Sequence, residues 1–94
     1  MSADRIRAHL TISGKVQGVF FRQNACRIAK SLDLNGYIKN LVNGCVEVVV
    51  EGEKNELCCF LDFCRHGPDG AEVKEIKIYY EEVKNDLEDF KILN

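Results

Sequence analysis

The stretch from Gly14 to Arg22, which reads Gly-Lys-Val-Gln-Gly-Val-Phe-Phe-Arg, has the residue types of an anion-binding loop. It contains no Asp or Glu, and its two glycines let successive backbone N–H groups curl towards one point. We expect a helix to begin at Arg22, so that the positive end of its dipole adds to these amides. A cation at a helix start is unfavourable unless an anion lies beside it, where guanidinium can grip two phosphate oxygens at once.

Residue types and spacing alone leave a second interpretation open for this stretch. It matches neither a Walker loop nor a Rossmann fingerprint, so it is equally consistent with an ordinary glycine-containing loop and a surface arginine. A second candidate is Asn40, which ends the run Gly36-Tyr37-Ile38-Lys39-Asn40. Asn is disfavoured inside strands, but a polar residue on the exposed face near a hairpin is an ordinary explanation for it. The pattern alone does not decide between these interpretations.

Hydrophobic periodicity predicts the first elements that must position these residues. Apolar residues alternate from residue 5 to residue 13, which predicts a half-buried strand. From residue 22 to about residue 34 they recur at helical spacing, and Asn35-Gly36 supplies a left-handed stop to this helix. We therefore expect the anion loop to join the end of a strand to the start of an amphipathic helix.

The remaining elements follow from turn signals and a second helical pattern. Asn43-Gly44 separates apolar runs over 37–42 and 45–51, and it is the strongest short-range signal for a two-residue hairpin. A second amphipathic helix is predicted over 54–65, and its end is marked by Gly67-Pro68-Asp69-Gly70. Strands over 73–82 and 90–93 complete the chain, and the acidic residues between them indicate a solvated loop.

This order of elements predicts an α+β fold, the ferredoxin-like α/β sandwich, in which two helices cover one face of an antiparallel sheet. The length of 94 residues allows one core, so residues 1–94 are expected to form a single domain. The fold hosts many unrelated activities and therefore does not identify the function.

Composition excludes several classes of function. Thirteen Lys and Arg against fifteen Asp and Glu give a net charge of −2, which lacks the basic excess of nucleic-acid-binding domains. No apolar run reaches the length of a membrane span, and Met1 to Arg5 shows no apolar core of a signal peptide. The five cysteines form no Cys-x-x-Cys pair and match no zinc spacing. Free thiols of this kind indicate a reducing, cytoplasmic location.

The two candidate stretches together resemble the signature segments of the acylphosphatases. Gly14–Arg22 looks like the first signature, and Gly36–Asn40, continuing through Asn43-Gly44-Cys45-Val46-Glu47-Val48 to Gly52, looks like the second. Later segments are also similar to the family, namely Gly67-Pro68 with Ala71-Glu72-Val73, and the ending Phe90-Lys91-Ile92. The resemblance covers nearly the whole chain.

The resemblance implies that the carboxyl–phosphate bond of acyl phosphates is hydrolysed to a carboxylate and inorganic phosphate, with no metal, no cofactor and no phosphoenzyme. The phosphate-binding arginine of the family falls on Arg22, and its water-orienting asparagine falls on Asn40. The cradle of backbone N–H groups falls on the residues before Arg22: Lys15, Val16, Gln17, Gly18, Val19, Phe20 and Phe21. A small acyl phosphate is the expected partner, with no nucleic acid, no membrane and a monomeric chain.

The sequence departs from the family pattern at three positions. Tyr37 stands where many relatives have Trp, and this exchange is expected to affect packing only. Ala25 and Leu41 stand where relatives often carry Thr, whose hydroxyl would support the asparagine or the loop. We therefore expect weaker support around the site than the signatures alone would indicate.

Two other functions compete with the enzyme. A non-catalytic module of the same fold, which binds a phosphorylated metabolite or a partner protein, would need Arg22 and the loop but not Asn40. An RNA-binding domain would need aromatic residues on its central strands for base stacking, and the predicted strand over 45–50 has none. The presence of both Arg22 and Asn40 favours the enzyme.

Overall fold

The first strand is longer than the alternation of apolar residues predicts. In the computed structural model, which describes residues 4–93, β1 runs from Arg5 to Lys15. Its register with β4 (Glu72–Glu81) shifts between Ser13 and Gly14, so a bulge carries the strand past the predicted end at residue 13. Three side chains of β1 that face the core are fully buried, namely Ala8, Leu10 and Ile12. Residues 1–3 lie outside the described part, so the structure does not bear on the prediction that the first five residues lack the core of a signal peptide.

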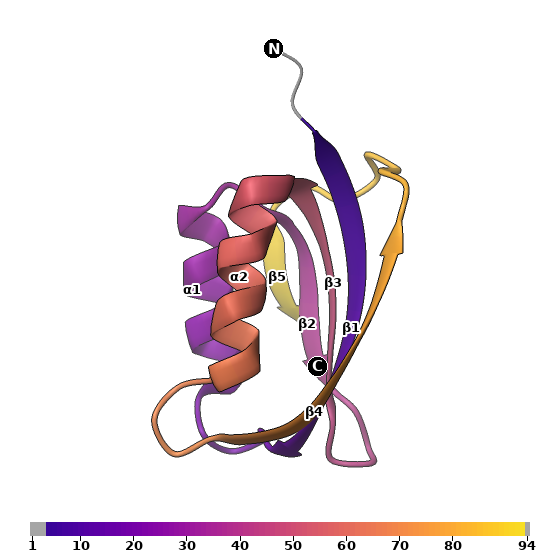
Figure 1. The fold of residues 1–94 in the computed structure, drawn as a ribbon. Coiled ribbons are helices and arrows are strands. Elements are labelled where there is room, and N and C mark those ends of the chain that lie inside the picture. Colours follow the sequence, from indigo (N-terminus) through magenta and orange to yellow (C-terminus); the bar gives the residue numbers. More distant parts are fainter. Residues whose placement is uncertain (1–3, 94) are drawn as a thin grey trace.

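Two helices cover one face of the sheet, as predicted (Figure 1). Helix α1 spans Phe21–Ser31 and helix α2 spans Lys54–His66. The ring of Phe21, at the start of α1, lies 5.6 Å from the ring of Phe63 in α2. This contact fixes the beginning of α1 against the second helix, next to the loop that follows β1.

The end of α1 differs from the prediction. The helix stops at Ser31, because Asp33 adopts a left-handed φ of 57° and the N–H of Leu34 donates back to the carbonyl of Ala29 at 3.0 Å. Asn35-Gly36, predicted as the helix stop, instead begins strand β2 (Asn35–Asn40). Asp tolerates this left-handed conformation, so the chain turns at Asp33, three residues before Gly36.

The connection between β2 and β3 (Val46–Glu53) is also longer than predicted. Residues 41–45 connect the strands, with the N–H of Leu41 donating to Cys45 O at 2.8 Å and that of Gly44 to Leu41 O at 3.2 Å. Gly44 has a φ of +93°, whereas Asn43 has no positive φ and its Oδ1 instead accepts the N–H of Cys45. The prediction of a two-residue turn was therefore wrong, and a four-residue turn over residues 41–44, whose last residue is the left-handed Gly44, takes its place.

The sheet has the strand order β4-β1-β3-β2-β5 and is mixed rather than wholly antiparallel. The four long strands pair antiparallel, but β5 (Phe90–Leu93) lies parallel to β2. Since β4 and β2 already run in opposite directions, a strand that follows β4 after one reversal must run parallel to β2. The short closing strand thus completes the edge of the sheet beside β2.

The acidic segment between β4 and β5 is tied to the sheet rather than simply solvated. The buried carboxylate of Glu51 accepts the backbone N–H groups of Lys84 and Asn85, both at 3.1 Å. The guanidinium of Arg7 donates to Glu51 at 3.2 Å and to Asp86 at 2.7 Å. These bonds anchor the crossing segment at the end of the sheet that lies away from the anion loop. Within residues 4–93, no helix is long and apolar enough to cross a membrane.

Candidate active site

The loop between β1 and α1 holds its backbone amides ready for an acceptor. Gly18 and Phe20 both have left-handed φ values, 76° and 61°, and Val19 between them does not. Alternating handedness of this kind turns consecutive N–H groups towards one point. Among residues 4–93, the amides of positions 16 to 21 donate to no other group. Their hydrogen-bonding capacity is therefore available to a ligand.

Buried side chains at both ends hold the loop in place. Val16, the first residue after β1, is buried in the core, as is Phe21, the first residue of α1. Lys15, the first of the cradle residues that the resemblance implies, is the last residue of β1 and pairs with Glu72. The other expected cradle residues, Val16 to Phe21, follow the end of the strand.

Arg22 lies in the first turn of α1, at the positive end of the helix dipole. This turn contains no acidic residue, and Phe20, at the N-cap position, makes no side-chain cap. Within the described chain, the half-exposed side chain of Arg22 forms no ion pair and no hydrogen bond. An arginine here opposes the helix dipole, so an anion in the loop would be stabilised by the amides, the dipole and the guanidinium together.

The loop and Arg22 surround a shallow hollow of about 140 Å³. Its lining consists of Val16, Gly18, Phe20, Phe21, Arg22 and Gln23. Among the residues that the structure describes, no carboxylate lines it, so no side chain of this lining would repel a phosphate group.

Gln17 links this loop to the strand that carries Asn40. Its side-chain Nε2 donates to the carbonyl of Leu41 at 2.9 Å and to that of Cys45 at 2.8 Å. The loop and the β2–β3 hairpin accordingly lie at the same end of the molecule (Figure 1). Asn40 itself ends β2 and pairs with Val46. The side-chain amide of Gln17 thus joins the anion loop to the hairpin residues that follow β2.

Asn40 carries an acceptor that the protein does not use. Its side chain lies on the same face of β2 as Ile38, which is buried under the helices. The Oδ1 atom of Asn40 is buried and has no hydrogen-bond partner within residues 4–93. A buried acceptor of this kind is costly unless it is satisfied by water or a ligand.

The contribution of Gln17 is the feature that sequence reasoning missed. The sequence placed this residue in the cradle through its backbone amide only. A polar side chain between apolar neighbours was the one available signal, and it did not reveal contacts 24 and 28 residues away.

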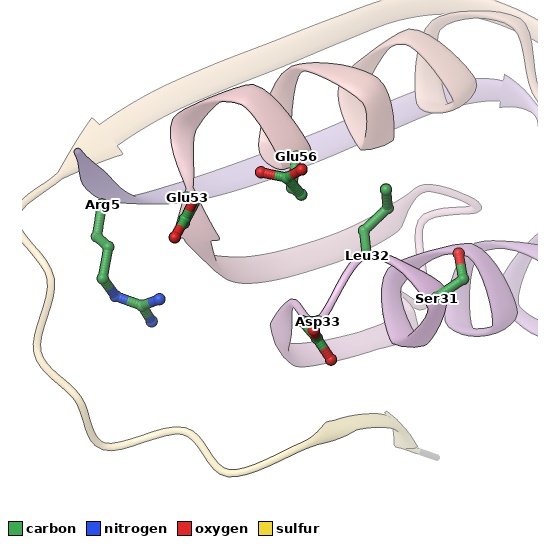
Figure 2. A pocket seen from close by; sticks show the side chains of 6 residues that line it. All are labelled: Arg5, Ser31, Leu32, Asp33, Glu53 and Glu56. Atoms are coloured by element: carbon green, nitrogen blue, oxygen red, sulfur yellow. The ribbon is translucent and has the colours of Figure 1, made fainter. Parts of the chain in front are cut away.

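A larger hollow of about 460 Å³ lies at the other end of the sheet (Figure 2). The carboxylates of Glu53 and Glu56 lie on one side of it and that of Asp33 on the other, and Arg5 is the one basic residue that lines it within residues 4–93. Three carboxylates around one arginine repel a phosphate group, so this hollow does not suit an anionic substrate despite its size.

The cysteines and histidines lie outside the hollow at the loop. All five cysteines are free, and burial raises the pKa of the Cys64 thiol far above its ordinary value. His9 contacts Glu47 at 2.8 Å, on the sheet face away from the helices, and His66 contacts the carbonyl of Asp62. No group of three or more metal-ligating side chains is arranged to hold a metal ion among residues 4–93.

Comparisons with known proteins identify the family and support the fold. A family model for acylphosphatases matches residues 8–92. An acylphosphatase of Moorella thermoacetica is 52% identical over 81 residues, which cover 86% of this chain and 87% of that protein. An acylphosphatase of Pyrobaculum islandicum is 42% identical over 91 residues, covering 96% of both chains. The structure of an acylphosphatase from Coxiella burnetii superposes with a TM-score of 0.89 at 37% identity, covering 96% of this chain and 94% of that one. The match over almost the whole length, together with the loop, Arg22 and Asn40, places this chain in the acylphosphatase family.

Proposed function

We propose that Arg22, Asn40 and the loop from Val16 to Phe21 carry out the reaction of this acylphosphatase, which hydrolyses the carboxyl–phosphate bond of acyl phosphates. The observation that carries the proposal is the buried Oδ1 of Asn40, which has no partner within residues 4–93 and lies at the end of β2, next to the hairpin residues that Gln17 bonds to the loop. A module that only bound phosphate would need the loop and Arg22, but it would not need an acceptor for water. This acceptor therefore favours hydrolysis over binding alone.

In the proposed complex, the phosphoryl group lies in the hollow at the loop. The amides of the loop donate to its oxygens, and the guanidinium of Arg22 binds two of them side by side. As the bond to the acyl oxygen loosens, negative charge on the phosphoryl oxygens faces donors that are already oriented. Such preorganised donors stabilise the transition state more than mobile water does.

In the proposed reaction, Asn40 orients the attacking water. Its Oδ1 accepts a hydrogen bond from a water molecule whose oxygen attacks phosphorus. The bond between phosphorus and the acyl oxygen breaks, and its electron pair leaves with the carboxylate. Because Asn40 is neutral, it positions the water without removing its proton, which passes to a phosphoryl oxygen of the substrate. A carboxylate is a good leaving group, so no general acid is needed and positioning supplies much of the rate.

The proposal includes the wider setting of the reaction. Residues 1–94 act as one domain and as a monomer, on a small acyl phosphate, without metal or cofactor. Five free cysteines favour a reducing, cytoplasmic compartment. The positive charges and donors that phosphoryl transfer requires come from Arg22, the loop amides and the start of α1, so the scheme has no step that calls for a metal ion.

The test is the hydrolysis of benzoyl phosphate in the presence of EDTA by the wild type and four variants. Arg22→Ala is expected to lose a factor of about 10²–10³ in kcat/KM, as for comparable electrostatic groups. Arg22→Lys should remain far below wild type, because an ammonium cannot form the two-pronged contact. Arg65→Ala changes an exposed arginine on α2 and serves as the matched control with wild-type activity.

Asn40→Ala separates catalysis from binding. We expect it to lose about 10²-fold in kcat while inorganic phosphate still inhibits it competitively, because the loop and Arg22 are intact. Full activity of Asn40→Ala would overturn the role of Asn40 in orienting water. Loss of wild-type activity in EDTA would overturn the metal-free scheme.

A further inference from the structure

The hollow at the loop has the size of a phosphoryl group rather than of a whole substrate. Its volume of about 140 Å³ corresponds to roughly four or five water molecules. Sites that enclose a complete small molecule usually measure about 300–1,000 Å³. A phosphoryl group in the hollow therefore leaves the acyl part of the substrate at its rim, against whichever side chain projects there.

Phe20 is the apolar side chain that projects at this rim. It lines the hollow beside Arg22, and 71% of its surface is exposed. Val16 and Phe21, the other large apolar residues of the lining, are buried in the core. An acyl group that extends out of the hollow thus has the ring of Phe20 as its apolar neighbour in the lining.

The backbone of Phe20 is strained, and its surroundings maintain this strain. Phe20 has φ 61° and ψ 25°, a left-handed conformation that a bulky residue rarely adopts. Its carbonyl accepts both the N–H of Asn24 at 3.1 Å and the Asn24 side-chain Nδ2 at 2.9 Å. Arg27 in turn donates to Asn24 Oδ1 at 2.6 Å. Strain that is held in this way, without burial of the ring to offset it, points to a functional role.

We propose that Phe20 selects the acyl group of the substrate. Its exposed ring receives an aromatic or extended apolar acyl group while the phosphoryl group lies in the hollow, so the enzyme favours such acyl phosphates over acetyl phosphate. The inference rests on the proposed function, because it takes the position of the phosphate from the loop and Arg22. The contact lies away from the breaking bond and is equal in the ground and transition states, so it lowers KM rather than raising kcat.

The test compares kcat/KM for benzoyl phosphate with kcat/KM for acetyl phosphate in the same enzyme preparation. The ratio is used because a disturbed loop would lower kcat/KM for both substrates by a similar factor, and this factor cancels in the ratio. Phe20→Asn removes the ring but suits the left-handed backbone, and we expect the ratio to fall about threefold to tenfold, the factor of one aromatic contact. The fall should come from KM for benzoyl phosphate. Val42→Ser, at an exposed apolar residue of the hairpin, is the control with an unchanged ratio.

An unchanged ratio in Phe20→Asn would overturn the inference, as would a fall that came wholly from kcat. The failure of this inference is distinguishable from that of the proposed function. If Arg22→Ala is inactive on both substrates and the ratio in Phe20→Asn is unchanged, only the role of Phe20 is wrong. If Arg22→Ala hydrolyses both substrates at the wild-type rate, the phosphate does not lie where both proposals require it.

Discussion

Replacing Gln17 by Met should damage catalysis more than it damages the fold. Gln17 donates one hydrogen bond to Leu41 O and one to Cys45 O, at 2.9 and 2.8 Å. Each neutral bond contributes about 0.5–1.5 kcal/mol to stability. Both carbonyls keep a second donor, the N–H of Gly44 for Leu41 and the N–H of Leu41 for Cys45, so neither is orphaned. Met keeps the length of the side chain, and the expected loss for the two bonds is about 1–3 kcal/mol.

The effect on the reaction follows from what these bonds join. They hold the anion loop against the hairpin whose first strand ends at Asn40. Without them the loop and Asn40, the proposed acceptor for water, shift relative to each other, and a displacement of about 1 Å can cost 10²-fold in rate. We expect kcat for benzoyl phosphate to fall about tenfold to a hundredfold in Gln17→Met. Inorganic phosphate should inhibit nearly as strongly as in wild type, because the loop amides and Arg22 remain.

The assay pairs urea unfolding with steady-state kinetics on the same variants. Gln17→Glu, which keeps the shape but places a carboxylate against two carbonyls, should be at least as impaired as Gln17→Met. Val50→Ala is the control for a general loss of stability, because it truncates a fully buried core residue on β3. Val50 lies four residues along this strand from Val46, the partner of Asn40, which is a distance of about 13 Å. It should lose about 2 kcal/mol with little change in kcat. Equal kcat in wild type and Gln17→Met would refute this reasoning.

Two further predictions concern the other end of the sheet. Glu51→Ala removes the carboxylate that accepts hydrogen bonds from Arg7 and from two backbone amides. The free energy of unfolding in urea should fall by about 3–5 kcal/mol, as expected when a buried ion pair loses one member. A loss below about 1 kcal/mol would show that the segment between β4 and β5 does not depend on Glu51. The hydrogen bond from Arg7 holds the pKa of the Asp86 carboxyl below its ordinary value of 3.8. The contribution of this ion pair to stability is therefore complete above pH 3.8, the pKa of Asp86 in the unfolded chain. It is lost as the pH falls through the lower pKa that Asp86 has in the folded protein. Asp86→Asn should flatten the decline of unfolding free energy below pH 3.8, and an unchanged slope would count against this pair.

Local patterns were sufficient to predict much of the fold. The alternation in β1 and the helical spacing in α1 and α2 depend on neighbours within a few residues, and the structure confirms all three elements. The anion loop could be proposed for the same reason, since two glycines, the absence of acidic residues and Arg22 lie within nine positions. The roles of Arg22 and Asn40 remain proposals, to which the structure adds that the guanidinium of Arg22 and the Oδ1 atom of Asn40 have no partner within residues 4–93.

The errors arose where distant or competing groups decide the structure. Asn43 has a side chain that accepts the N–H of Cys45, and this bond accompanies a longer turn than its Asn-Gly dipeptide indicates. Asp33, rather than the following glycine, takes the left-handed conformation after α1. The parallel pairing of β5 depends on where the chain leaves β4, which no local pattern contains. The contacts of Gln17 likewise join segments more than 20 residues apart.

Two arginines at opposite ends of the sheet, Arg7 and Arg22, differ in the partners that the chain supplies for their charge. Arg7 is nearly buried and has three carboxylates within 4 Å, on Glu51, Asp86 and Glu81. Arg22 has none within the described residues, although it sits half-buried at a helix end that already carries positive charge. A charge withdrawn from water needs a partner, and the chain supplies one for Arg7 from its own side chains. In the proposed complex, a carboxylate beside Arg22 would occupy the place of the substrate phosphate. Under this proposal, the absence of acidic residues from the loop and the first turn of α1 is a requirement of binding, and Arg22 obtains its partner from the substrate.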